Sequence, residues 1–387
     1  MMLDLQPSAW SRVRLGHVVD RSRKQVDPIT AEVQRYVGGG HIDGDSLTVD
    51  RWGDPSDGHM GSTFRFVFEP GQVLFVSARP YLRKTGLVNF SGVVADKTYV
   101  LDATPGGGLL QAFLPLVLSS DVFVSYASGA ATGSMNPRLL WGPMQKYEFA
   151  LPPLEEQRRI ADLMWAVERH RHRLREELAA TRRAVEHEVE LAIRSAGRMV
   201  SIGDVAEINP EQASRWDPTA SIDYIDIASV MPDAQGLDEA AVKSMAFGEA
   251  PGRARRIVRA GDILVSTVRP GLRSVARIPP TLHGQLASTG FAVLRPGPEI
   301  SPSFLWQLVC SDRFTNDMIS KSTGSAYPAV RGSDVASFQF GLPTRPIAAS
   351  LDEMMRLAEK ATLALAREAS ALDRLWGSLQ AAIFGGN

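Results

Sequence analysis

The chain has 387 residues, of which 44% are hydrophobic and 22% are charged, and its formal net charge is −1 at pH 7. This composition is ordinary for a globular protein of about two to three domains, since one domain usually holds roughly 100–200 residues. The single cysteine excludes an intramolecular disulfide framework and any site built from several cysteines. The balanced charge excludes a protein that coats nucleic acid through bulk positive charge. No apolar run approaches the roughly 20 residues that cross a bilayer, and we expect a cytoplasmic protein.

A long internal repeat divides the sequence into two related copies. Residues 70–83 correspond to 260–273, and both stretches place Arg-Pro-x-Leu-Arg after an apolar run. Further along, GSMNP at 133–137 corresponds to GSAYP at 324–328, and each copy then reaches Phe-x-Leu-Pro. The spacing of about 190 residues exceeds the roughly 20–50 residues of solenoid repeats, so it indicates a duplicated domain.

The two copies differ most at segments 36–60 and 224–250, which share little beyond an opening Tyr-Val or Tyr-Ile. Their polar composition, rich in Gly, Asp and Ser, predicts loops, whereas the matched apolar runs predict strands. Two loop sets on one scaffold favour two similar tasks on two different targets. Neutral drift after duplication is the alternative.

A helical pattern with a heptad seam closes each copy. The first begins after Pro152-Pro153, and Arg171, Thr181 and Glu188 interrupt its seam. Two such seams most simply pack on each other, antiparallel because a whole domain separates them, although each helix could instead pack only on its own domain. The predicted seam residues are Ile160, Met164, Val167, Leu174, Leu178 and Val185 in the first helix and Leu351, Met355, Leu365, Leu372, Trp376 and Leu379 in the second.

We therefore predict an α+β protein with two similar domains, at 1–153 and 198–345. A long helix follows each domain, at 154–197 and 346–387. The two helices would form an antiparallel coiled-coil spacer, which gives the chain approximate two-fold symmetry.

No arrangement of residues predicts catalysis or metal binding. The glycine runs at 38–40 and 106–108 lack the Gly-Lys-Ser/Thr of a phosphate loop. Glu69, Asp96 and Lys97 could form a nuclease site, but the second copy has Arg, Thr and Gly at these places. We expect no catalytic residue and no metal site.

Arginine recognises phosphate groups and guanine edges through paired hydrogen bonds, so the basic and polar loops are candidates for DNA binding. Arg79 and Arg269 could instead pair with a carboxylate and hold their turn, and the basic run at 253–259 could be a solvated loop. Near-neutral charge in each half favours a partner that supplies part of the grip on DNA. The candidates are Arg79, Tyr81, Arg83, Lys84, Ser134, Asn136 and Arg138 in the first copy and Arg253, Arg255, Arg256, Arg269, Arg273, Ser325, Tyr327 and Arg331 in the second.

Residues 151–161, LPPLEEQRRIA, resemble the proline-glutamine motif that opens the conserved helix in specificity subunits of type I restriction-modification systems. Residues 71–84 resemble the Gly-Asp-Ile-Leu strand and Arg-Pro turn of that family, and 261–266 resemble it more closely. The resemblance covers the whole chain in the order domain, helix, domain, helix. The second helix opens with LPTRPI at 342–347 and lacks the Glu-Glu-Gln.

The resemblance implies a non-catalytic subunit whose two target-recognition domains each read one half of a bipartite, asymmetric sequence in double-stranded DNA. The helices would set the spacing of the halves and dock DNA adenine methyltransferase subunits, two in number, which a restriction and translocase subunit can join. The chain itself would bind no cofactor, because S-adenosylmethionine and ATP would belong to these partners. The alternatives are a scaffold of a phage-defence complex without target reading and an enzyme that acts on nucleic acid alone.

Overall fold

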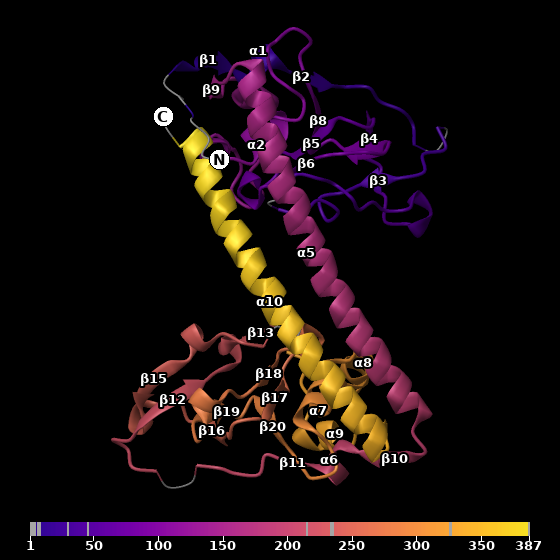
Figure 1. Ribbon diagram of the computed structural model, residues 1–387, viewed down its shortest axis with the longest axis vertical. Coiled ribbons are helices and arrows are strands. Elements are labelled where there is room, and N and C mark those ends of the chain that lie inside the picture. The colour runs from indigo at the N-terminus through magenta and orange to yellow at the C-terminus, as the bar shows by residue number, and fades with distance from the viewer. Residues whose placement is uncertain are drawn as a thin grey trace. The chain divides into compact units, whose positions relative to one another are not determined.

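The computed structural model describes residues 5, 9–28, 31–44, 46–213, 216–232, 236–324 and 327–385. It has a mixed α+β architecture (Figure 1) and divides into two compact units. Unit 1 comprises residues 1–176 and 365–387, and unit 2 comprises residues 177–364. Each unit therefore contains a part of both long helices. None of the helices in the described ranges combines the length and the apolarity that a membrane crossing needs.

Unit 1 is built on small sheets that short helices cover. The central sheet has the strand order β2-β8-β5-β6, a second sheet has the order β3-β7-β4, and β1 pairs with β9. The strands are β1 (Ser11–Arg14), β2 (Val19–Ser22), β3 (Tyr36–Val37), β4 (Phe64–Phe68), β5 (Val73–Val76), β6 (Thr85–Leu87), β7 (Gly92–Ala95), β8 (Thr98–Ala103) and β9 (Glu148–Leu151). The helices are α1 (Leu15–Val18), α2 (Leu114–Leu118), α3 (Asp121–Gly129) and α4 (Trp141–Gln145), with short 3₁₀ turns η2 (Pro55–Asp57) and η3 (Pro80–Leu82).

Unit 2 repeats this plan. Its central sheet has the order β11-β20-β17-β18, the second sheet has the order β15-β12-β19-β16, and β10 pairs with β21. The strands are β10 (Arg198–Ser201), β11 (Ala206–Ile208), β12 (Ser221–Ile225), β13 (Val230–Met231), β14 (Gly236–Leu237), β15 (Lys243–Ala246), β16 (Ala254–Ile257), β17 (Ile263–Ser266), β18 (Val275–Arg277), β19 (Leu286–Ser288), β20 (Phe291–Pro296) and β21 (Gln339–Leu342). The helices are α6 (Ile202–Val205), α7 (Pro302–Cys310), α8 (Asp312–Lys321) and α9 (Gly332–Ala336), with 3₁₀ turns η4 (Ile227–Ser229), η5 (Glu239–Ala241), η6 (Phe247–Glu249), η7 (Pro270–Leu272) and η8 (Pro280–Leu282).

The central strands β5 and β17 are buried on both faces, which explains their continuous apolar sequences. Successive side chains of a strand point to opposite faces. Accordingly, Val73 and Phe75 of β5 join one hydrophobic core while Leu74 joins another. In β17, Ile263 and Leu264 divide between two cores in the same way. The sequence repeat therefore corresponds to a central strand in each unit whose side chains alternate between two hydrophobic cores.

The two long helices are α5 (Leu154–Ser195), of 42 residues, and α10 (Arg345–Phe384), of 40 residues. Pro152 and Pro153 precede α5, and Glu155 and Glu156 lie in its first turn, where acidic side chains stabilise the helix dipole. The observed helices closely follow the predicted ranges 154–197 and 346–387, of which 386 and 387 lie outside the described residues. The predicted domain boundaries stay predictions.

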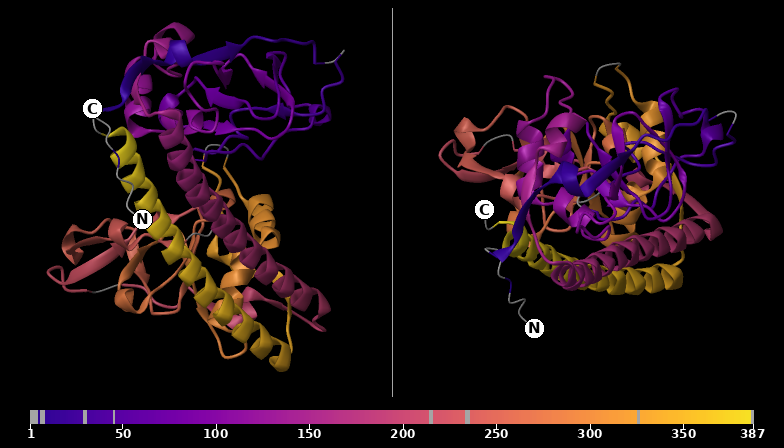
Figure 2. Two further views of the ribbon diagram at one scale, coloured as in Figure 1. Left: turned by 45° about the horizontal axis from the view of Figure 1, so that its top comes forward. Right: turned by 90° about the horizontal axis from the view of Figure 1, so that it is seen from above.

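The helices pair in antiparallel fashion within each unit, as the seams predicted. In unit 1 the start of α5 shares a core with Ile383 and Phe384 at the end of α10 (Figure 2). In unit 2 the end of α5 shares a core with Leu351 and Met355 at the start of α10. The predicted seam residues that are buried are Ile160, Met164, Val167, Leu174, Val185, Leu351 and Met355, and those that are half-buried are Leu178, Leu365, Leu372, Trp376 and Leu379.

The seam differs from the prediction near the end of α5. Glu188, an expected seam position, is exposed, and Val189 is buried in its place. A straight α-helix has 3.6 residues per turn, so a strict heptad pattern drifts around its surface by about 20° per repeat. The buried face has moved by one residue after several heptads.

Candidate functional site

The chain makes the same strained turn after β5 and after β17. Arg79 and Arg83 have φ values of 52° and 54° on either side of η3. Arg269 and Arg273 both have a φ of 51° on either side of η7. Residues other than glycine rarely adopt this left-handed conformation, and residues held in it cluster at functional sites. We call residues 79–83 and 269–273 the arginine turns.

A second loop lies against each arginine turn. In unit 1 the amide of Arg79 donates to the carbonyl of Pro137 at 2.7 Å, and residues 132 and 138 close that loop with backbone hydrogen bonds. In unit 2 the amide of Arg269 donates to the carbonyl of Pro328, also at 2.7 Å, and residues 323 and 329 close the loop. We call 132–138 and 323–329 the companion loops. Each unit thus presents one turn and one loop fixed to each other through the backbone.

The exposed side chains of this surface differ between the units. In unit 1, Tyr81 is 52% exposed and Met135 is 86% exposed, and Ser134 and Asn136 beside it are also exposed. The side chain of Arg79 is exposed and makes no hydrogen bond or ion pair with any residue that the structure describes.

In unit 2, the guanidinium of Arg269 lies 4.7 Å from the ring centre of Tyr327, which is 69% exposed. Leu272 is exposed on the turn, and Arg331 is exposed where α9 begins. The predicted candidate Ser325 lies outside the described residues. The two surfaces thus share an exposed leucine, Leu82 and Leu272, and differ in Tyr81 and Met135 of unit 1 and in the Arg269–Tyr327 pair of unit 2.

Some predicted DNA-binding residues hold the turns instead. Arg83 forms an ion pair with Asp121 and donates to the carbonyl of Ser119 at 3.2 Å. Arg273 forms the equivalent ion pair with Asp312. The carboxylate pairing considered for the first arginine of each turn is thus found at the last arginine. These bonds tie each turn to the first residue of α3 or α8.

Two further candidates of unit 1 are also engaged within the protein. Arg138 donates to the carboxylate of Asp96 and to the hydroxyl of Ser77, both at 3.0 Å. Lys84 donates to the backbone carbonyl of Gly39. These interactions give Arg138 and Lys84 a structural role, and their contact with DNA stays a prediction.

The basic run of unit 2 is held locally. Arg253 forms an ion pair with Asp226 at 3.3 Å, and Arg255 donates to the carbonyl of Gly252 at 2.9 Å. Burial lowers the pKa of the Arg256 guanidinium, whose Nε has no hydrogen-bond partner among the described atoms. Among the described residues, no hydrogen bond or ion pair joins these arginines to the turn at 269–273.

Sequence reasoning missed an exposed aromatic site in segment 36–60 and its surroundings. The guanidinium of Arg35 lies 4.7 Å from the ring centre of Trp52, which also packs against Phe90. The signal that could have identified this site is the single tryptophan, Trp52, within a segment that is otherwise polar and rich in glycine.

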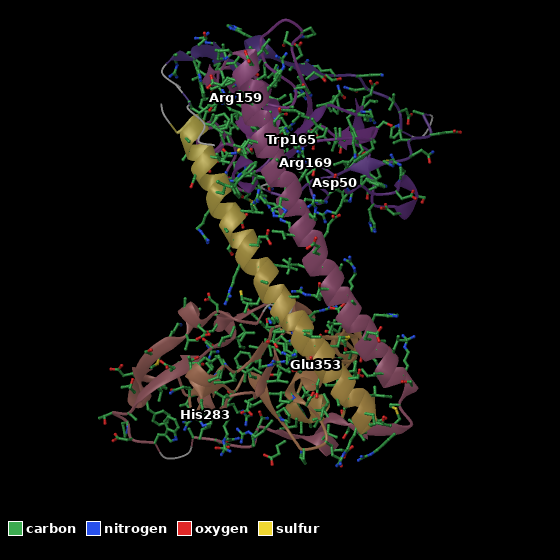
Figure 3. All side chains as sticks on the ribbon, in the orientation of Figure 1. Asp50, Arg159, Trp165, Arg169, His283 and Glu353 are labelled. Carbon is green, nitrogen blue, oxygen red and sulfur yellow. The ribbon has the colours of Figure 1, made fainter. Side chains whose placement is uncertain are left out.

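The helix-opening motif also has a local role that its sequence did not reveal. Gln157 is fully buried, accepts from the amide of Leu110 at 2.8 Å and donates to the carbonyls of Gly108 and Pro152 at 2.7 Å. Trp165 lies about two turns further along α5 (Figure 3) and donates to the carbonyl of Ala112 at 2.8 Å. The start of α5 is therefore fastened to the glycine-rich loop of unit 1.

No cluster of three or more potential metal ligands from His, Cys, Asp and Glu occurs in the described ranges. No family model matches the chain. A segment of 136 residues is 29% identical to the HindI type I restriction enzyme specificity subunit of Haemophilus influenzae, covering 33% of this chain and 30% of that protein. The matches cover about a third of the length of the curated relatives.

Solved structures cover nearly the whole chain. The S subunit of a type I restriction-modification system from M. genitalium has a TM-score of 0.55 and 11% identity, with 97% of this chain and 96% of that chain covered. A chain from a structure of complex assembly and conformational transition of the type I restriction-modification system has a TM-score of 0.51 and 22% identity, with 98% of both chains covered. The predicted resemblance is thus confirmed: in a stretch of its sequence and in its fold, the chain is similar to specificity subunits of type I restriction-modification systems.

Proposed function

We propose that this chain is the DNA sequence-recognition subunit of a type I restriction-modification complex. Unit 1 and unit 2 would each read one half of a bipartite, asymmetric target in double-stranded DNA. One observation carries the proposal: the arginine turn recurs in both units with the same left-handed backbone and the same hydrogen bond to a second loop, and different side chains are exposed around it. A shared frame with different contacts is what reading two different half-sites requires.

The proposal includes partners that perform the chemistry. Two DNA adenine methyltransferase subunits would dock on the paired helices, and a restriction and translocase subunit would join them. S-adenosylmethionine and ATP would be held by these partners, so the chain would bind no cofactor and would act in the cytoplasm without catalysis of its own. The formal charge of −1 supports this arrangement, because tight solitary binding to DNA requires many neutralised phosphates.

Methylation by the complex of this chain with its methyltransferase partner tests the proposal. We expect modified adenines to map to one bipartite sequence when a randomised DNA library is the substrate. Arg79→Ala should weaken discrimination at one half and Arg269→Ala at the other, by about 1–3 kcal/mol if the arginine contacts a base. Arg65→Ala, which removes an exposed arginine from β4, is the matched control and should leave both halves unchanged.

Two outcomes would contradict the proposal as a whole, and a third would contradict the role of the arginine turns. A complex that binds or methylates DNA without sequence preference would indicate a scaffold. Methylation by the purified chain alone with S-adenosylmethionine would indicate an enzyme. If Arg79→Ala and Arg269→Ala both keep the wild-type preference at both half-sites, the arginine turns do not take part in reading the DNA sequence.

A further inference from the structure

We propose that a partly buried ionic network in the helix pair positions the reading loops of unit 1, so that recognition of its half-site depends on the pairing of α5 with α10. The network consists of Glu168, Arg171 and Asp373. This inference rests on the proposed function, because it concerns how one recognition surface is held in place.

Glu168 of α5 connects the helix to segment 36–60. Its side chain is 2% exposed, and one carboxylate oxygen accepts from the amide of Leu47 at 3.0 Å and from the hydroxyl of Ser46 at 3.3 Å. The other oxygen accepts from Arg171 at 3.1 Å. A buried carboxylate is costly unless donors surround it, and these three donors come from the loop and from the helix. The loop is therefore attached to α5 at a charged site.

Arg171 carries the connection to α10. Its Nε and one terminal nitrogen lie 2.9 and 2.8 Å from a carboxylate oxygen of Asp373, and its guanidinium lies 5.0 Å from the ring centre of Trp376. The neighbouring His170 lies 2.8 Å from Glu368 on the same pair of helices. Arg171 thus bridges Glu168 on its own helix and Asp373 on α10.

The loop end of the network leads directly to the arginine turn. The carbonyl of Leu47 accepts from the amide of Leu87 at 2.8 Å, so residues 47–49 run beside β6, which begins two residues after Arg83. Gly44 approaches the turn so closely that a Cβ there would lie 2.6 Å from the carbonyl oxygen of Leu82. Lys84 reaches back to segment 36–60 at the carbonyl of Gly39. One of these contacts reaches the turn itself, at Leu82, and the other two reach Lys84 and Leu87 directly after it.

A polar cavity of about 370 Å³ brings the two ends of this connection together. Its walls include Gly44 and Arg83 from the loop and the turn, and Arg171, Asp373 and Trp376 from the helices. Residues of the helix seam, of the loop and of the arginine turn therefore line one common space in unit 1.

Unit 2 has no equivalent among its described residues. In the internal repeat Pro152 corresponds to Pro343, so Glu168 corresponds to Glu359 and Arg171 to Thr362. The side chain of Glu359 is 71% exposed and lies 3.8 Å from Arg277, and Thr362 is exposed. The position of Glu359 thus offers a matched control on the other helix.

The test uses the complex of the full chain with its methyltransferase partner and a panel of targets with single base changes in either half. Arg79→Ala assigns one half-site to unit 1. In Glu168→Ala we expect discrimination at that half-site to fall by about tenfold or more, the scale of one lost base contact, while the other half-site keeps its preference. Glu168→Gln should lose less, because its amide oxygen still accepts from Leu47, and Glu359→Ala should match the wild type.

Several outcomes would overturn the inference. Equal loss at both half-sites, or unchanged discrimination in a folded Glu168→Ala complex, contradicts it. If the Glu168→Ala complex does not assemble, Asp373→Asn is tested instead. Asp373 is more exposed than Glu168, and asparagine has the same size as aspartate, so the fold should tolerate this change. No shift at the half-site of unit 1 in that variant contradicts the inference too. A wild-type complex without sequence preference would instead refute the proposed function.

Discussion

Replacing Gln157 with alanine should loosen the start of α5 from unit 1. The side chain is fully buried and makes three hydrogen bonds with backbone groups, to Leu110, Gly108 and Pro152. A buried backbone group that loses its partner costs about 1–3 kcal/mol, and because the bonds to Leu110 and Gly108 are only part-buried we take the low end for each of the three, about 3 kcal/mol in all. For a unit of this size each kcal/mol lowers the melting temperature by roughly 2–4 °C, so we expect a decrease of about 6–12 °C.

Thermal unfolding followed by circular dichroism measures this decrease, and hydrogen exchange locates it. Amides of residues 104–112 should exchange faster in Gln157→Ala, because the amide of Leu110 no longer has its acceptor. Arg158→Ala is the control, since this neighbouring residue is exposed on the same helix. An unchanged melting temperature together with unchanged exchange at 104–112 would refute the reasoning that the motif glutamine fastens the helix to the loop.

Three further predictions follow from single residues. Burial raises the pKa of Cys310 to about 12, so iodoacetamide should alkylate it at about pH 8 only after unfolding, and rapid alkylation of the native chain would contradict this. The guanidinium of Arg295 holds the pKa of Glu211 below its ordinary value, so its stabilisation is present above about pH 4.5 and is lost as the pH falls further. In Glu211→Gln the melting temperature should therefore fall less steeply as the pH is lowered below about 4.5. A fall as steep as in the wild type would contradict a stabilising role of the ion pair. Asp121→Asn should lower the free energy of unfolding by less than about 1 kcal/mol, because the carboxylate that pairs with Arg83 is largely exposed. A larger loss, measured by urea unfolding, would contradict this prediction.

Much of the fold could be predicted from the sequence because its signals are periodic or repeated. Paired prolines mark the start of α5, and alternating steps of three and four mark the buried face of both long helices. The repeat predicts a duplicated domain, and the central sheets of the two units do have corresponding strand orders, whereas the second sheet of unit 2 has one strand more than that of unit 1. The seam fails at Glu188, where the drift of a straight helix accumulates over several turns. A heptad pattern therefore predicts the buried residues of a helix over a few turns and becomes less accurate further along the helix.

The candidate site could be predicted only in part, because charge in the sequence does not reveal what a side chain pairs with. Arg79 and Arg83 occupy the same turn and look equivalent in the sequence, yet the first is exposed and the second pairs with Asp121, 38 residues away. Arg138 similarly finds Asp96 through the fold and not through the sequence. The left-handed backbone of the turns was also hidden, since arginine is not a residue that indicates a positive φ.

Apolar contacts join the two helices in both units, and unit 1 adds an ionic contact to them. Unit 2 packs Val185 and Val189 of α5 with Leu351 and Met355 of α10. Unit 1 packs the start of α5 with Ile383 and Phe384 of α10. Unit 1 places a buried arginine at the seam, and a slip of either helix would leave its charge without Asp373. Asp373 is 59% exposed and Arg171 keeps Glu168 as a partner, so solvent screening keeps the stabilisation by the Arg171–Asp373 pair modest. We interpret the apolar contacts of both units as the source of cohesion and the ionic contact of unit 1 as the feature that favours one register of α10 on α5.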